Sequence, residues 1–365
     1  MERQRLTQLK KVMRVQSNSG KCDRMQRFVM KELDAMDIDY SKDKTGNIYA
    51  TKGNAEMYPT MVCHMDTVHD INDHAVVFQH QDVLFAIDTK SYERYGIGGD
   101  DKVGVFITLE MLQKFDHFKA VFFVDEEIGC VGSSACDLTF LEDSTFILQC
   151  DRRGKSDFVT TISGTKLSND ELHNHIDDLL KKYDRKLTSG GMTDVEQIAE
   201  KTDVQVANMS CGYYDPHSDN EYIKISEVFA TADFCYEVLS KTDGKLWRMP
   251  NADRFSYNYR ANRYYGGWNY YHDDWYDEDE TTYYHRYNPE TNQMDKVCAY
   301  TNQLLSVEEI EELDENEEDK ELSAMHSCKC KHENLEWFKD EKVFYCMDCY
   351  QTFDENKNLL EDYGY

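Results

Sequence analysis

The sequence of 365 residues carries a formal net charge of −29 and twelve cysteines. The negative charge argues against binding to nucleic acid or to an anionic membrane, because phosphate groups would repel it. No apolar run approaches the roughly 20 residues that span a bilayer, and the N-terminus lacks the apolar core of a signal peptide. We therefore expect a cytoplasmic protein whose cysteines are thiols and metal ligands rather than disulfides.

The first 245 residues hold most of the aliphatic side chains and alternate between predicted helices and strands. Two helices are expected within residues 4–36, separated at 17–20, followed by hairpins at 39–52 and 75–87. Buried strands are expected at 60–64, 120–124, 146–150 and 204–209, and helices at 103–115, 168–183, 193–201 and 226–240. This alternation predicts an α/β fold, a three-layer sandwich with a mostly parallel central sheet.

Polar residues follow these predicted strands or a glycine turn at five places: His64, Asp100, Glu127, Asp151 and His217. Ligands of open α/β sheets bind outside the carboxyl ends of the strands, so we expect the five side chains to converge. Singly, such a carboxylate is more often a helix cap or a solvated turn. Together, two histidines and three carboxylates suit divalent metals, zinc first. Five ligands are too many for one catalytic zinc and suit two zincs that share a bridging carboxylate.

These motifs resemble the co-catalytic di-zinc exopeptidases of the peptidase T, aminoacylase and carboxypeptidase kind (clan MH). The resemblance runs over about residues 5–240 and rests, in chain order, on Ser17-Asn18-Ser19-Gly20, Thr45-Gly46-Asn47, His64-Met65-Asp66-Thr67-Val68, Gly99-Asp100-Asp101-Lys102, Asp125-Glu126-Glu127-Ile128-Gly129, Cys150-Asp151, and Gly190-Gly191-Met192-Thr193-Asp194 before Pro216-His217. It implies a zinc exopeptidase-like fold and two catalytic Zn²⁺ ions, or Co²⁺ or Mn²⁺ in their place.

The resemblance also implies a role for each site residue. Asp100 would bridge the two metals. His64 and Asp151 would complete one metal site, and Glu127 and His217 would complete the other. Asp66 would orient His64, since residues i and i+2 of a strand point to the same side. Glu126 would be the general base rather than a ligand. Zinc lowers the pKa of a bound water to about 7, and Glu126 would take its proton and return it to the leaving amine.

The predicted function is cleavage of peptide bonds by an aminopeptidase or a di- or tripeptidase. An N-acyl amino acid deacylase would use the same metals, so peptides and N-acyl amino acids are both candidate substrates. The remaining alternative is a non-catalytic metal-binding scaffold, although the complete ligand set argues against it. Peptidase T-like relatives insert a lid domain between the residues equivalent to Asp151 and His217. Only 65 residues separate them here, so we expect no lid, with His69 and Tyr214 as candidates to assist at the oxyanion instead.

Residues 246–325 are predicted to be a Tyr/Asp-rich and acidic linker, with a solvated helix at 307–321. Within it, residues 251–293 contain ten tyrosines but no Ile, Leu, Val or Met, so they have little with which to offset the entropy of ordering.

Residues 326–365 resemble a zinc ribbon, with short strands expected at 335–338 and 342–345. One structural zinc is expected on Cys330, His332, Cys346 and Cys349, with Cys328 as the alternative partner of Cys330. The alternative interpretation is that these cysteines are scattered free thiols, although so small a segment rarely folds without a bound metal or a similar cross-link. The acidic surroundings favour a protein as the partner of this module.

Overall fold

The structure, a computed structural model, describes residues 2–250 and the backbone of five strands at 283–288, 293–298, 335–338, 343–346 and 352–353. The chain divides into two units, residues 1–269 and 270–365. The helices of the first unit are α1 (Glu2–Met13), α2 (Asp23–Ala35), α3 (Gly99–Lys114), α4 (Val131–Ser134), α5 (Asp170–Lys182), α6 (Asp194–Ala199) and α7 (Ile225–Thr242), with a 3-10 helix at Leu138–Leu141. In residues 2–250 we find no helix long and apolar enough to cross a membrane.

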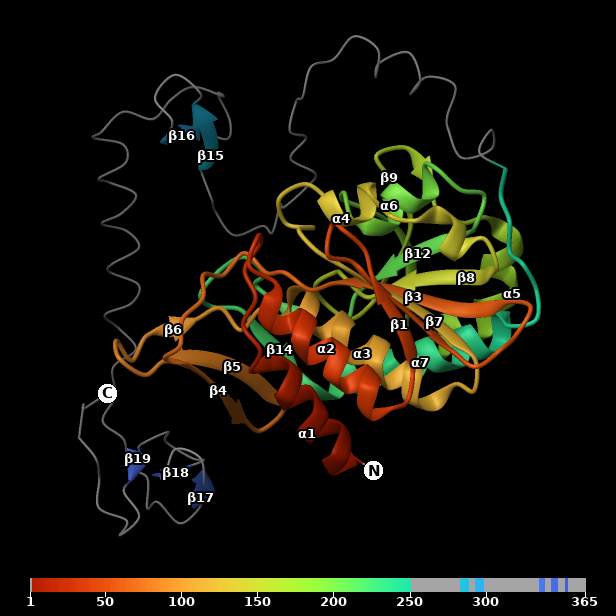
Figure 1. Cartoon of the computed structure of the whole chain (residues 1–365). Coiled ribbons are helices and arrows are strands. Elements are labelled where there is room, and N and C mark those ends of the chain that lie inside the picture. The colour runs from red at the N-terminus through yellow and green to blue at the C-terminus, as the bar shows by residue number, and fades with distance from the viewer. Residues whose placement is uncertain are drawn as a thin grey trace. The chain divides into compact units, whose positions relative to one another are not determined.

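A mixed sheet of nine strands forms the centre of residues 2–250 (Figure 1). Its strands are β1 (Asp39–Lys42), β2 (Ile48–Lys52), β3 (Tyr58–His64), β7 (Phe118–Phe123), β8 (Ser144–Gln149), β9 (Asp157–Ile162), β10 (Thr165–Lys166), β11 (Lys186–Gly190) and β12 (Val206–Met209). They lie in the order β1-β2-β7-β3-β8-β12-β9-β10, and β11 pairs with β9. The central strands β7, β3, β8 and β12 are parallel, and most pairings toward the edges are antiparallel. The predicted α/β class and its parallel central strands are confirmed.

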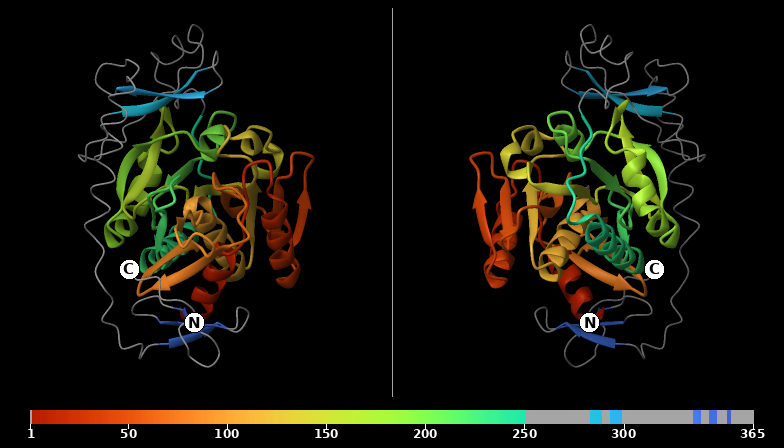
Figure 2. Two further views of the ribbon diagram at one scale, coloured as in Figure 1. Left: turned by 90° about the vertical axis from the view of Figure 1, so that its left-hand side faces the viewer. Right: turned by 90° about the vertical axis from the view of Figure 1, so that its right-hand side faces the viewer.

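Helices cover both faces of this sheet (Figures 1 and 2). On one face α1, α2, α3, α5 and α7 bury their apolar side chains in the larger core cluster. Helix α2 does so with Met25, Val29 and Leu33, whose spacing of four places them on one stripe. On the other face, α6 packs Val195 and Ile198 into a smaller cluster. Every residue of β3 and β7 is buried, as expected for strands covered on both sides.

A second, smaller sheet lies beside the first in the same unit. It contains β4 (Ala75–His80), β5 (Val83–Asp88), β6 (Arg94–Tyr95), β13 (Tyr213–Tyr214) and β14 (Tyr222–Lys224). The hairpin predicted at 75–87 is confirmed as β4–β5. This sheet brings the chain from β6 into the start of α3, and β13 and β14 flank the turn that carries His217. Two loops of the candidate site are thus attached to one small sheet.

The chain continues to pack on the first unit after α7. Trp247 is buried, its main-chain N–H donates to Thr145 O (2.9 Å), and that of Met249 donates to Asp203 O (2.7 Å). Thr145 lies at the start of β8 and Asp203 just before β12, at the end of the large sheet away from His64. The described first unit therefore includes residues as far as Met249.

In the second unit, β15 (Tyr283–Asn288) and β16 (Gln293–Cys298) form an antiparallel hairpin inside the predicted linker, which sequence patterns had not indicated. The strands β17 (Leu335–Phe338), β18 (Val343–Cys346) and β19 (Thr352–Phe353) form a three-stranded sheet, so the two strands expected in this module are confirmed. Cys346 is the last residue of β18. The other expected zinc ligands (Cys328, Cys330, His332 and Cys349), most of the linker and the acidic stretch at 307–321 lie outside the described residues.

Candidate metal centre

The residues predicted as metal ligands meet at the carboxyl-end edge of the large sheet. His64 ends β3, Glu127 and Asp151 follow β7 and β8, Asp100 lies in the first turn of α3, and His217 follows β13. The structure brings all five within a few ångströms of one another. This convergence follows from the parallel direction of β3, β7 and β8, which places their ends at one edge.

Asp100 lies between the two histidines. One of its carboxylate oxygens, Oδ1, is 3.2 Å from Nε2 of His64, and the other, Oδ2, is 3.4 Å from Nε2 of His217. On one side Nε2 of His64 is 3.6 Å from Asp151 Oδ1, and on the other Nε2 of His217 is 3.0 Å from Glu127 Oε2. Each histidine thus has its own carboxylate, and both share Asp100. A carboxylate placed this way offers one oxygen to each of two neighbouring cations.

The carboxylate of Asp66 binds mainly the backbone of Glu126 and Glu127 rather than the imidazole of His64. The Nδ1 atom of His64 is 3.0 Å from the main-chain oxygen of Asp66 and 3.5 Å from its carboxylate. That carboxylate accepts the main-chain N–H groups of Glu126 (3.0 Å) and Glu127 (3.2 Å) and the hydroxyl of Ser19 (2.8 Å). Burial alone would raise the pKa of Asp66, but the hydrogen bonds from His64, Glu126 and Ser19 lower it overall. His64 is therefore oriented chiefly by the main chain at Asp66.

Three side chains to which the sequence assigned no role hold Asp151. The hydroxyl of Thr193 donates to Oδ2 (2.6 Å), as does the amide of Gln149 (3.2 Å), and the hydroxyl of Tyr213 donates to Oδ1 (3.2 Å). Gln149 and Asp151 are two residues apart, so the i, i+2 rule that linked His64 with Asp66 applies to them as well. Thr193 lies within the motif that ends in Asp194, whereas no local pattern indicated Tyr213.

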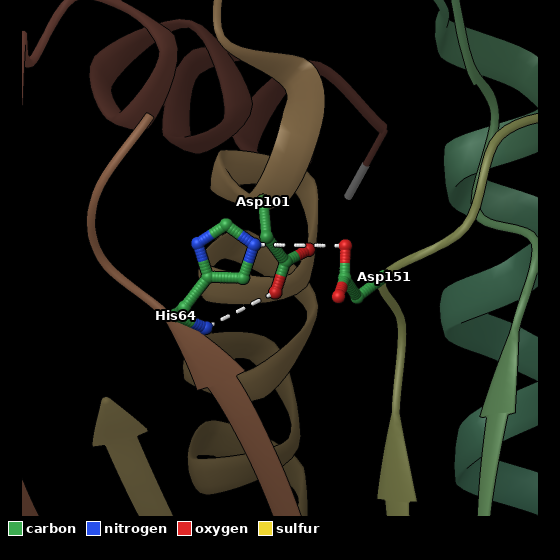
Figure 3. Close-up of side chains that lie close together, drawn as sticks. All are labelled: His64, Asp101 and Asp151. Carbon is green, nitrogen blue, oxygen red and sulfur yellow. Dashed lines mark hydrogen bonds and ion pairs between the residues drawn. The ribbon is translucent and has the colours of Figure 1, made fainter. Parts of the chain in front are cut away.

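Asp101, next in the chain to Asp100, also lies beside His64 and Asp151 (Figure 3). Its two carboxylate oxygens accept the main-chain N–H groups of His64 (3.2 Å) and Gly104 (2.9 Å). Both oxygens are therefore already engaged by the backbone. Asp101 ties the end of β3 to the start of α3, and Asp100 is the better candidate for a metal ligand.

Glu126 faces the same space as the ligands. Its Oε2 atom is 4.0 Å from Nε2 of His64, farther than the oxygens of Asp100 and Asp151, and Cys130 donates its S–H to Oε1 (3.4 Å). Burial raises the pKa of Glu126 well above its ordinary value, to which the nearby carboxylates contribute. A carboxyl that is near the ligands and biased toward holding a proton suits a general acid–base.

Negative charge is concentrated at this centre. Seven buried or nearly buried carboxyls gather there: Asp66, Asp100, Asp101, Glu126, Glu127, Asp151 and Asp194. Among residues 2–250, the ion-pairing side chains that face them are His64 and His217, and no lysine or arginine joins them. Burial, with neighbouring carboxylates, raises the pKa of both Glu127 and Asp194 to about 7.

The donor set fits divalent cations. Buried carboxylates without counter-charges are costly, and cations that bind them remove that cost. Glu127 Oε1 and Asp194 Oδ1 are buried and accept no hydrogen bond within the described part of the chain. Glu127 already contacts His217 through its other oxygen, so its Oε1 atom is available to bind a cation.

His69 and Tyr214, expected as oxyanion assistants, are engaged elsewhere. The Nε2 atom of His69 is 3.1 Å from Glu221 Oε2, and the Tyr214 hydroxyl donates to Glu227 (2.6 Å). Their polar atoms are thus committed to carboxylates outside the ligand set. We do not assign either residue to the reacting centre.

Asn47 holds the turn that carries Glu126 and Glu127. Its side-chain oxygen accepts the N–H of Val124 (3.2 Å), and its amide donates to Gly132 O (3.0 Å), joining the end of β7 to α4. A Cβ on Gly132 would overlap Val124 O and Asn47 Oδ1. The turn therefore depends on the absence of a side chain at this position.

We expect Gly132→Ala to lower the free energy of unfolding by about 1–3 kcal/mol, as overpacking of a tight site does, measured by urea denaturation. Gly191→Ala is the matched control, because a Cβ there has no atom within 4 Å. Equal stability of the two variants would contradict this account of the turn.

Comparison with known proteins gives a likeness of fold. No protein-family model matches the sequence, and no curated protein matches it. The aminopeptidase PepT from Bacillus cereus ATCC 10987 matches with a TM-score of 0.57 at 14% identity, over 66% of this chain and 99% of that one.

Two further solved structures are similar. A tripeptidase from Staphylococcus aureus subsp. aureus Mu50 matches with a TM-score of 0.54 at 14% identity, over 66% of this chain and 98% of the other. The TET aminopeptidase from the marine sediment archaeon Thaumarchaeota archaeon SCGC AB-539-E09 matches with a TM-score of 0.50 at 13% identity, over 67% and 98%. At these identities, the likeness shows that the chain shares their fold.

Proposed function

We propose that this protein is a metallopeptidase with two catalytic metal ions that cleaves peptides from their amino end, as an aminopeptidase or a di- or tripeptidase. The observation that carries the proposal is the position of Asp100, whose two oxygens each lie within 3.4 Å of a histidine. Each histidine also lies beside a second carboxylate, and bound cations would neutralise the surrounding negative charge. The shared fold supports it, since two of the similar structures are named aminopeptidases and one a tripeptidase.

In this proposal Asp100 would be a ligand of both metals. His64 and Asp151 would hold one of them, and Glu127 and His217 would hold the other. When bound, the metals would supply an activated water and polarise the scissile carbonyl. Glu126 would accept a proton from the attacking water and deliver it to the leaving amine. Asp66 fixes the backbone of Glu126 and Glu127, so the base and one ligand keep a constant separation.

We also propose that no lid domain is inserted between Asp151 and His217. The interval between Asp151 and His217 is fully described, and it is occupied by strands β9 to β13 and helices α5 and α6. These elements belong to the two sheets and their covering layers. Substrate specificity would then depend on residues around the metal centre rather than on a domain inserted in this interval.

Metal content and a substrate panel on the full chain test this function. We expect about two metal equivalents at the centre, and a third on the C-terminal module, which we propose to be a zinc ribbon. The double variant Cys346→Ser/Cys349→Ser should lose only the third equivalent. Wild-type chains without metal at the centre would overturn the proposal.

The panel compares peptides with a free amino terminus with the same peptides N-acetylated. Preferential cleavage of the free-amine set is expected. Exclusive cleavage of the acylated set would assign the deacylase activity instead. No cleavage of either set by fully metal-loaded protein would indicate a binding role.

A further inference from the structure

The loop that carries Asp100 is held by a residue outside the ligand set. Glu221 is completely buried. Its Oε1 atom accepts the main-chain N–H of Asp100 (3.0 Å), and its Oε2 atom accepts that of Gly98 (2.6 Å). One carboxylate therefore binds both ends of the three-residue turn from which the Asp100 side chain projects.

Glu221 is also tied to the other half of the centre. It follows His217 by four residues, and its own N–H donates to Ser218 O (3.2 Å) across that turn. Arg94 donates from Nη2 to the main-chain oxygens of Asn220 (3.0 Å) and Glu221 (3.2 Å). The turn after His217 is thus clamped, so Glu221 links the loop of one proposed ligand to the loop of another.

His69 supports Glu221 from behind. Its Nε2 atom lies 3.1 Å from Oε2 of Glu221, and the side chain is largely buried. The ring occupies the space over Gly96, where a Cβ would overlap it. His69 therefore has a fixed position and supplies a hydrogen bond to a buried carboxylate whose other partners are main-chain N–H groups.

We propose that Glu221, supported by His69, is a positioning residue that sets the carboxylate of Asp100 between the two metal ions. The inference rests on the proposed function and adds to it a residue that contacts neither metal nor substrate. Because a bridging ligand must meet two cations at once, an error in its placement weakens both sites. Partners that orient metal ligands typically change metal affinity or activity by 10–100-fold when they are lost.

The variant Glu221→Gln tests this with little change in shape. In this variant an NH2 group would replace one of the two accepting oxygens. It would face the main-chain N–H of either Gly98 or Asp100, with which it cannot form a hydrogen bond. We expect metal affinity, measured by competition with a chelating dye, to fall about 10–100-fold. Activity should return toward wild type at saturating metal, with KM unchanged.

Glu110→Gln is the matched control. Glu110 is also buried, but it pairs with Arg5 (3.0 Å) and Lys114 (2.6 Å) at the far end of α3. This substitution removes a buried carboxylate without touching the Asp100 loop, so metal affinity should not change. His69→Phe is the second variant, since it keeps a ring over Gly96 and removes the hydrogen bond. It should lower affinity in the same direction by a smaller factor.

Wild-type affinity in Glu221→Gln would overturn the inference while leaving the proposed function intact. If Glu221→Gln does not fold, His69→Phe decides, and unchanged affinity in that variant would overturn it equally. Wild-type protein that binds no metal at the centre would instead overturn the proposed function. The two failures are therefore distinguishable.

Discussion

Glu126→Gln is expected to lower peptide hydrolysis by about two to four orders of magnitude, while metal content stays at the wild-type level. The side chain lies farther from His64 than Asp100 and Asp151 do, so its loss removes no proposed ligand. Glutamine has nearly the same shape but cannot accept and return a proton. General acid–base catalysis typically contributes 10²–10⁴-fold, and we expect kcat to fall by about that factor. Steady-state kinetics and metal analysis of the same preparation measure both effects.

Glu127→Gln is the informative contrast, because Glu127 lies 3.0 Å from His217 and its other oxygen is free. It should lose metal as well as activity. Because the two substitutions are isosteric and lie at adjacent positions, comparing them separates the role of general base from that of metal ligand. Undiminished hydrolysis by Glu126→Gln would contradict the assignment of the base. Loss of metal in that variant would reassign Glu126 as a ligand.

Removal of metal is expected to lower the thermal midpoint of the first unit by about 8–16 °C. A ligand that binds only the folded state stabilises it by about 4 kcal/mol at a thousand times its dissociation constant. For a unit of this size, each kcal/mol shifts the midpoint by about 2–4 °C. Calorimetry of the full chain, before and after treatment with a chelator, measures the shift. Adding zinc back should restore the original midpoint.

The pH dependence gives this effect an electrostatic signature. In the metal-free protein, burial raises the pKa of Glu127 and of Asp194 to about 7, from their ordinary values of 4.5 and 3.8. A carboxyl with a raised folded-state pKa contributes stability that is full below its unfolded pKa and is lost as pH rises through the folded value. The metal-free midpoint should therefore fall between about pH 4 and pH 7. A midpoint that is unchanged by verified metal loss would contradict the argument.

Much of this architecture is predictable from the sequence because the buried parallel strands are nearly continuous apolar runs. The runs in β3, β7 and β8 end abruptly in polar residues, and the geometry of parallel sheets places those ends together. The strands that escaped prediction lack this signal. β11 is largely exposed, and β14 has only three residues, so neither shows a strong period. In the β15–β16 hairpin, β15 contains three tyrosines and no aliphatic residue.

The residues that support the ligands were less predictable. Tyr213 reaches Asp151, and Glu221 reaches Asp100, across 62 and 121 positions of the chain. No local pattern encodes a hydrogen bond of that kind, because it exists only once the sheets have packed. The same holds for Asp66, whose main-chain oxygen turned out to be closer to the His64 ring than its carboxylate. Side-chain spacing can indicate which residues share a face, but not which atom of a residue makes the contact.

The order of strands in the large sheet bears on how the protein is made. β12 lies between β8 and β9, although it is synthesised after both. A chain still on the ribosome with only β8 and β9 exposed has a gap in its sheet, and it also lacks His217. Contacts between such distant segments form late. A nascent chain that stops before residue 206 therefore has an unfinished sheet with unpaired strand edges, and it lacks one of the proposed metal ligands.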